Sequence, residues 1–167
     1  SIIASELLDS VDQASEPTHL FLQEGVGQFA AGMIQALRHQ FTQTKIIIVE
    51  PATVDCYFES IKQGDGQLHT IPGSPQTIMA GLNCQTPSAS AWPIIKDNVA
   101  YYGTLTDDIA EKGMRRLANP FDQDSKIIAG ESGVAGFAYV NALLTDPQYK
   151  MQREQLGLDE SSRVMVI

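Results

Sequence analysis

Short runs of apolar residues alternate along the chain with longer stretches in which apolar residues recur at helical spacing. The runs at 20–22 and 46–49 contain only Leu, Phe, Ile and Val, and they predict strands at 19–23 and 45–49. Continuous apolar runs of this length are typical of parallel strands that are buried on both faces. Between the two runs, five apolar residues share the spacing of one helix face: Phe29, Met33, Ile34, Leu37 and Phe41. The pattern therefore predicts an α/β domain with a mostly parallel sheet and helices on both faces.

The same alternation continues through the rest of the chain. Further helices are predicted at 54–61, 77–82, 87–97, 107–118, 134–144 and 147–156, with a loop at 69–75 and strands at 99–103 and 163–167. Thr106 is a predicted N-cap of the helix at 107–118, because Asp107 and Asp108 follow it in the first turn. Arg115 and Arg116 lie in the last turn, where the helix dipole favours cations.

Both ends of the chain fall within predicted elements. Ser1 leads directly into the helical spacing of Ile3, Leu7, Leu8 and Val11, and the chain stops inside the apolar run 164–167. Unpaired apolar strand edges favour association with another chain. We therefore expect residues 1–167 to be a single partial domain that self-associates or belongs to a homodimer.

Composition and charge exclude several classes of function. The chain has 167 residues, a formal net charge of −9 and 43% hydrophobic residues. Nucleic acids and anionic membranes require a basic surface, so neither is an expected partner. No apolar stretch approaches the roughly 20 residues of a membrane helix. Cys56 and Cys84 lack metal-ligand spacing and are expected to be reduced cytoplasmic thiols, while His19, His39 and His69 are far apart, so no metal site is expected.

The strongest candidate for a binding site is the junction Gly25-Val26-Gly27-Gln28, directly after the first predicted strand. Glycines permit a tight turn here, and the free N–H groups of a helix start can bind phosphate. The spacing also fits a dinucleotide-binding turn, with Glu50 placed at the end of the next strand for a ribose. A third interpretation is a turn that only packs a helix on the sheet. Glu24 would repel a phosphate unless its side chain points away.

A second candidate is Gly130-Glu131-Ser132-Gly133. It matches the nucleophile elbow of hydrolases only in part, because Val134 stands in place of the final glycine and no histidine follows the serine. Two interpretations remain open. Glu131 and Ser132 present their side chains to a cofactor, or Ser132 simply caps the following helix, which residue type alone favours.

Taken in order, five segments resemble the pyridoxal-phosphate (PLP) enzymes of the tryptophan-synthase-β-like family, and among them the diaminopropionate ammonia-lyases. The segments are 23–27, 49–51, 77–82, 113–120 and 130–133. The resemblance implies part of the large domain of a fold-type II enzyme. It also implies α,β-elimination of 2,3-diaminopropionate to pyruvate and ammonia, with PLP accepting the carbanion charge.

The resemblance also assigns roles to residues. The glycine junction, Gly25 to Gln28, would hold the PLP phosphate through backbone N–H groups, and Glu131 and Ser132 would lie near the ring. The family usually has small residues at the positions of Glu24 and Gln28. Its Schiff-base lysine is expected upstream of Ser1, because no lysine of this chain stands in that motif. The chain is therefore expected to be inactive alone.

Three other functions remain open from the sequence. The first is a different β-family lyase, such as a threonine dehydratase. The second is an NAD-dependent oxidoreductase module. The third is a degenerate, non-catalytic domain, which Glu24 would favour.

Overall fold

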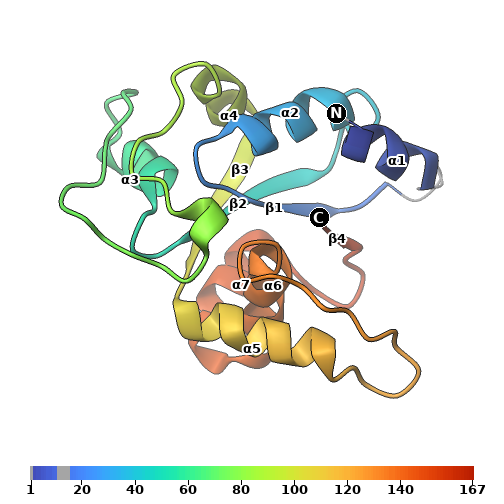
Figure 1. Cartoon of the computed structure of the whole chain (residues 1–167). Helices are drawn as coiled ribbons and strands as arrows, with labels where there is room; N and C mark the ends of the chain where they lie inside the picture. Colours follow the sequence, from blue (N-terminus) through green and yellow to red (C-terminus); the bar gives the residue numbers. More distant parts are fainter. Residues whose placement is uncertain (1, 11–15) are drawn as a thin grey trace.

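A four-stranded parallel sheet lies at the centre of the computed structural model, which describes residues 2–10 and 16–167 (Figure 1). Its strands are β1 (His19–Gln23), β2 (Lys45–Pro51), β3 (Val99–Leu105) and β4 (Val164–Val166). They lie in the order β3-β2-β1-β4, and every pair is parallel. The predicted α/β class with a parallel sheet is therefore confirmed.

Successive residues of the two central strands point to opposite faces of the sheet, as strand geometry requires. Phe21, Ile47 and Val49 belong to one buried cluster. Leu20, Leu22, Ile46 and Ile48 belong to the other. Both faces of β1 and β2 are thus covered, which explains why their sequences are continuous apolar runs rather than alternating ones.

Helices cover both faces of the sheet (Figure 1). One side carries α1 (Ile2–Ser10), α2 (Gln28–Leu37), α3 (Cys56–Gln63) and α4 (Trp92–Asn98). The other side carries α5 (Asp107–Ala118), α6 (Ala135–Thr145) and α7 (Lys150–Leu156). Two short 3₁₀ helices complete the described elements: η2 (Ala80–Leu82) and η3 (Pro147–Tyr149).

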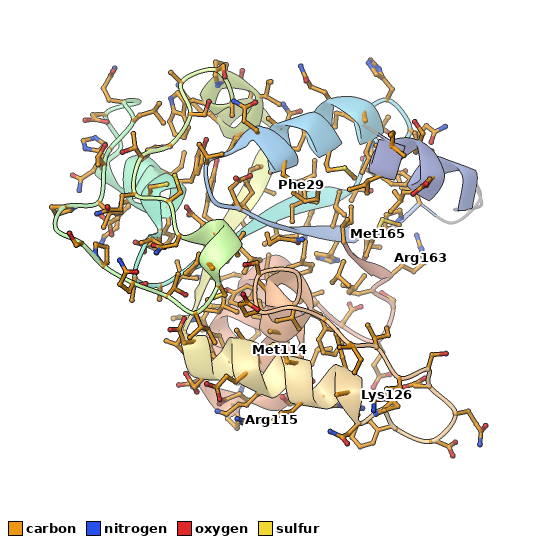
Figure 2. The ribbon with its side chains drawn as sticks, in the orientation of Figure 1. Phe29, Met114, Arg115, Lys126, Arg163 and Met165 are labelled. Atoms are coloured by element: carbon orange, nitrogen blue, oxygen red, sulfur yellow. The ribbon has the colours of Figure 1, made fainter. Side chains whose placement is uncertain are left out.

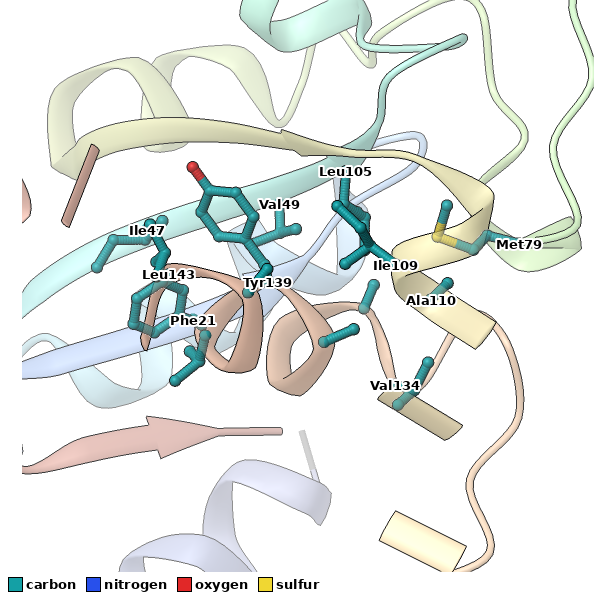
Figure 3. Packing of buried hydrophobic residues seen from close by; sticks show 14 of the residues in the cluster. Phe21, Ile47, Val49, Met79, Leu105, Ile109, Ala110, Val134, Tyr139 and Leu143 are labelled. Atoms are coloured by element: carbon teal, nitrogen blue, oxygen red, sulfur yellow. The ribbon is translucent and has the colours of Figure 1, made fainter. Parts of the chain in front are cut away.

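Helix α6 packs closely against its neighbours because glycines face it. A Cβ atom on Gly103 of β3 would lie 2.5 Å from the ring of Tyr139, and one on Gly113 of α5 would lie 2.6 Å from Ala138 Cβ. Figure 3 shows the Tyr139 ring standing between α6 and the sheet, beside Val49. These approaches bring α6 against the sheet, and the segment before α6 lies beside the carboxyl end of β1.

Several predicted element boundaries differ from the structure. The helix expected at 77–82 is reduced to the three residues of η2, and the helix expected at 87–97 begins only at Trp92, with Pro93 next. Thr106 precedes α5 as predicted, but its hydroxyl contacts the Asp108 carboxylate and caps no backbone N–H. The Thr106 hydroxyl donates to Asp108, and the carboxylate of Asp107 instead accepts from Thr77 and Ile78.

The first helix buries a face that overlaps the predicted one, with Ala4 in place of Ile3. Ala4 is fully buried against the core, Leu7 and Leu8 are half-buried, and Ile3 is exposed. Val11 lies outside the described residues. Among the helices that the structure describes, none has the length and apolar character needed to cross a membrane.

Candidate functional site

A cavity of about 260 Å³ opens beyond the carboxyl end of β1, beside the start of α2. Open α/β sheets bind ligands at this edge, where the strands end and helices begin. Three segments surround the cavity: the turn between β1 and α2, the short helix η2, and the loop before α6. Its lining residues are Gln23, Glu24, Gly25, Val26, Phe29, Gly81, Leu82, Ser132 and Gly133.

The turn between β1 and α2 requires glycine at position 27. Gly27 has φ +109°, a conformation that L-residues rarely adopt, and a Cβ atom there would lie 1.9 Å from Tyr57 Oη. That hydroxyl donates to the Val26 carbonyl at 2.9 Å and accepts the Ser88 N–H at 3.1 Å. Tyr57 of α3 therefore holds the turn in place from the side of the sheet that α2 covers.

The carboxylate of Glu24 lies underneath this turn. Glu24 is 2% exposed, and it accepts hydrogen bonds from the N–H groups of Gly25 at 2.8 Å, Gly27, and Ala30 at 3.2 Å. Burial raises the pKa of Glu24 to about 7, against the opposing effect of these three hydrogen bonds. The side chain is thus an internal acceptor for two of the N–H groups that the sequence assigned to a phosphate.

The other N–H groups of the turn are free. Among the residues that the structure describes, none accepts a hydrogen bond from the N–H groups of Val26, Gln28 and Phe29. Phe29, labelled in Figure 2, lies in the first turn of α2 and borders the cavity. Unpaired N–H groups at the start of a ten-residue helix form an environment that stabilises an anion.

The side chain of Gln28 does not line the cavity. Its amide donates to Ser88 Oγ at 2.8 Å and Ser90 Oγ at 2.9 Å. These bonds hold Gln28 against the segment that leads into α4. The side chain of Gln28 therefore lies away from the cavity.

Ser132 lines the cavity, whereas Glu131 is not among the lining residues. The hydroxyl of Ser132 accepts the N–H of Gly81 in η2 at 2.9 Å. The N-cap position of α6 is Val134, and no side chain caps that helix. The interpretation of Ser132 as a helix cap is therefore wrong, because its side chain joins the loop before α6 to η2.

Gln23 is a site residue that the sequence did not single out. It is the last residue of β1 and lines the cavity, and its side-chain carbonyl Oε1 is buried without a hydrogen-bond partner among the described residues. Buried acceptors are rarely left unpaired in folded proteins. Its position at the end of a predicted strand, just before the glycine turn, could have identified Gln23 from the sequence.

Glu50 does not serve this cavity. It is fully buried, and its two carboxylate oxygens accept the N–H groups of Tyr57 at 2.9 Å and Phe58 at 2.8 Å at the start of α3. Burial raises the pKa of Glu50 to about 8, and the neighbouring acids Asp55 and Glu24 add to the effect. Glu50 is therefore not available to a ribose, which contradicts the dinucleotide interpretation.

No lysine lines the cavity. Lys45 lies at the opposite end of β2 and donates to the Leu156 carbonyl at 2.7 Å. Figure 2 shows Lys126 in the loop after α5, across the sheet from Phe29. The other four lysines lie on helices: Lys62, Lys96, Lys112 and Lys150.

The arrangement suits a small ligand with two features. An anionic group matches the free N–H donors at the start of α2, and a hydrogen-bond donor matches the unpaired carbonyl of Gln23. Glu24 can be neutral near physiological pH, since burial raises its pKa to about 7, and it then no longer repels an anion.

Comparison with known proteins gives one consistent result. The family model described as "Pyridoxal-phosphate dependent enzyme" matches residues 1–166. The chain is 39% identical to diaminopropionate ammonia-lyase of Salmonella typhimurium over 154 residues, which cover 90% of this chain and 38% of that protein. It is 36% identical to diaminopropionate ammonia-lyase of Escherichia coli K12 over 165 residues, which cover 95% of this chain and 41% of that protein.

A solved structure of the Escherichia coli enzyme matches the fold as well. That structure, in complex with an aminoacrylate-PLP azomethine reaction intermediate, superposes with a TM-score of 0.85 at 34% identity, covering 99% of this chain and 42% of the other. This chain therefore has the fold of part of a fold-type II PLP enzyme, and it spans about 40% of the length of these relatives.

Proposed function

Because the chain belongs to the pyridoxal-phosphate-dependent enzyme family, we propose that residues 1–167 form the phosphate-binding part of the large domain of a diaminopropionate ammonia-lyase. The whole enzyme would cleave 2,3-diaminopropionate to pyruvate and ammonia. The observation that supports this most directly is the cavity beyond β1, which a glycine turn with free N–H donors borders in a chain 36–39% identical to such enzymes.

The N–H groups of Val26, Gln28 and Phe29 would hold the cofactor phosphate, since they have no other acceptor among the described residues. Gly25 and Gly27 shape the turn, and their own N–H groups become available when Glu24 releases them. When bound, PLP supplies an electron sink for the negative charge that develops at the substrate Cα.

Other residues of the cavity would orient the pyridine ring and exclude water from it. Gln23 and Ser132 offer polar side chains on the side of the cavity away from α2, and we place Glu131 close by in the same loop. Val26 and Phe29 add apolar surface at the rim, which lowers the local dielectric and strengthens polar interactions inside. We place the Schiff-base lysine outside residues 1–167, because no lysine of this chain lines the cavity.

We also propose a cytoplasmic location and a homodimer for the whole enzyme. The location is consistent with Cys56 and Cys84, which are free thiols.

A chimeric enzyme tests the proposed activity. The 165-residue segment of the Escherichia coli diaminopropionate ammonia-lyase that aligns with this chain is replaced by this chain. We expect the purified chimera to release pyruvate from 2,3-diaminopropionate, as followed with lactate dehydrogenase. The matched control carries Gly27→Ala, which should abolish turnover, because the side chain overlaps Tyr57 and disrupts the turn.

Two results would contradict the proposal in different ways. A folded chimera that acts on threonine but not on 2,3-diaminopropionate would indicate another β-family lyase. A folded chimera that binds PLP but acts on no amino acid would indicate a domain that is no longer catalytic.

A further inference from the structure

The turn between β1 and α2 contains two sets of backbone donors, one bonded to a side chain and one without a hydrogen bond among the described residues. The N–H groups of Gly25, Gly27 and Ala30 donate to the carboxylate of Glu24, underneath the turn. The N–H groups of Val26, Gln28 and Phe29 have no acceptor among the described residues. One short turn therefore offers donors to two anions at once: the buried side chain of Glu24 and any anionic group of a ligand.

We infer that Glu24 is a proton-coupled positioning residue, so that an anionic group binds at this turn together with uptake of a proton by the Glu24 carboxylate. The inference rests on the proposed function, because it takes the turn as the phosphate site. An ionised Glu24 holds the turn in shape when no ligand is bound. A second negative charge bound at the same turn then favours the protonated, neutral form of Glu24.

Within the part of the chain that the structure describes, no cationic side chain lines the cavity to stabilise two negative charges at once. Strand β2 contributes Glu50, and α3 contributes Cys56 and Tyr57, which are all acids. The first turn of α2, η2 and the part of the loop before α6 that lines the cavity contribute no titratable side chain. Among the described residues, the cavity is lined by no lysine, arginine or histidine.

The burial of Glu24 also favours the protonated form of its carboxylate. Its carboxylate is 2% exposed, and burial raises its pKa to about 7, so that the free site already exchanges a proton near neutral pH. A glutamate that only capped a helix would change the stability of the chain but would not link anion binding to protons. The two roles therefore differ in a measurable quantity, the number of protons taken up for each anion bound.

Isothermal titration calorimetry with sulfate measures this number on the 167-residue chain. Sulfate is a suitable probe because, unlike phosphate, it does not change its charge near neutral pH. Titrations in two buffers of different ionisation enthalpy, at each of several pH values, give the protons exchanged. Above about pH 7 we expect the sulfate affinity of the native chain to fall by up to about tenfold per pH unit, with proton uptake approaching about one per sulfate.

The variant Glu24→Gln removes the titrating group and keeps its shape and an acceptor oxygen. We expect it to bind sulfate with an affinity that changes less than about twofold over the same pH range, and without proton uptake. Glu50→Gln is the matched control, since it neutralises a buried carboxylate that contacts α3 instead of the turn. Proton uptake should remain in this control.

The possible results separate the inference from the proposed function. Sulfate binding by the native chain without proton uptake overturns the coupling and leaves the phosphate site intact. Absence of sulfate binding in both the native chain and Glu24→Gln overturns the phosphate site, and the coupling with it. If Glu24→Gln does not fold, as judged by circular dichroism, the proton count of the native chain alone decides.

Discussion

The substitution Gly27→Ala tests whether the turn between β1 and α2 is fixed by its backbone and by Tyr57. Gly27 has φ +109°, and an L-residue in a left-handed conformation costs about 1–2 kcal/mol. The added Cβ atom would lie 1.9 Å from Tyr57 Oη and 2.8 Å from Ala91 Cβ, and such overpacking costs about 1–3 kcal/mol. Displacing the Tyr57 hydroxyl also loses its bonds to Val26 and Ser88, at about 1 kcal/mol each.

Together these effects predict that Gly27→Ala lowers the free energy of unfolding by about 4–7 kcal/mol, a large part of the stability of an ordinary domain. The matched control is Gly64→Ala, which has a similar backbone requirement at φ +70° but no atom within 4 Å of the added Cβ. It should cost only about 1–2 kcal/mol, because only the backbone term applies.

Urea unfolding followed by the fluorescence of Trp92 measures both variants. Trp92 is the one tryptophan of the chain, and its ring centroid lies 6.1 Å from that of Tyr57, so the signal reports on this region. In a Tyr57→Phe background the added cost of Gly27→Ala should shrink, since the overlapping hydroxyl is gone. Equal destabilisation by Gly27→Ala and Gly64→Ala would contradict the predicted overlap of the added Cβ atom with Tyr57.

Three further outcomes are expected. Glu24 and Glu50 have pKa values raised from 4.5 to about 7 and about 8, so the folded chain retains protons that the unfolded chain has lost. The free energy of unfolding, measured in urea, should therefore fall by about 3 kcal/mol for Glu24 as pH rises from about 5 to 8. A flat or rising profile, or the same slope in Glu24→Gln, would contradict this. The chain alone, supplied with PLP, should release no pyruvate from 2,3-diaminopropionate in a lactate-dehydrogenase-coupled assay, because no lysine lines the cavity, and robust turnover would refute this. The chain should self-associate through β4, where Val164 and Val166 are 39% exposed, and Val166→Lys should weaken this; a clean monomer across a sedimentation dilution series would contradict it.

The central strands and the glycine turn could be predicted from the sequence because each depends on local residues. The apolar runs at 20–22 and 46–49 are continuous because helices cover both faces of the sheet. Their composition alone therefore predicts that these strands are buried. Gly27 was identifiable because a tight turn after a strand needs a residue without Cβ.

Side-chain partners that are distant in the chain could not be predicted in the same way. Ser132 has the residue type of a helix cap, but its hydroxyl contacts Gly81, 51 positions earlier, and no local pattern encodes that contact. Glu24 raised the question of which way its side chain points, and the answer depends on the burial of the turn beneath α2. Glu50 stands at a position that suits a ribose, but the N–H groups at the start of α3 donate to both of its oxygens.

The central claim is that this turn holds the phosphate of the cofactor. The most direct test compares the affinities of the chain for pyridoxine 5'-phosphate and for pyridoxine, each measured by equilibrium dialysis. Neither compound has an aldehyde, so neither reacts with the six lysines of the chain. Charge-assisted hydrogen bonds contribute about 1.5–3 kcal/mol, so the phosphorylated compound should bind about 10- to 100-fold more tightly. Gly27→Ala should remove this difference, and Gly64→Ala should retain it. Equal affinity of the native chain for the two compounds would contradict the account.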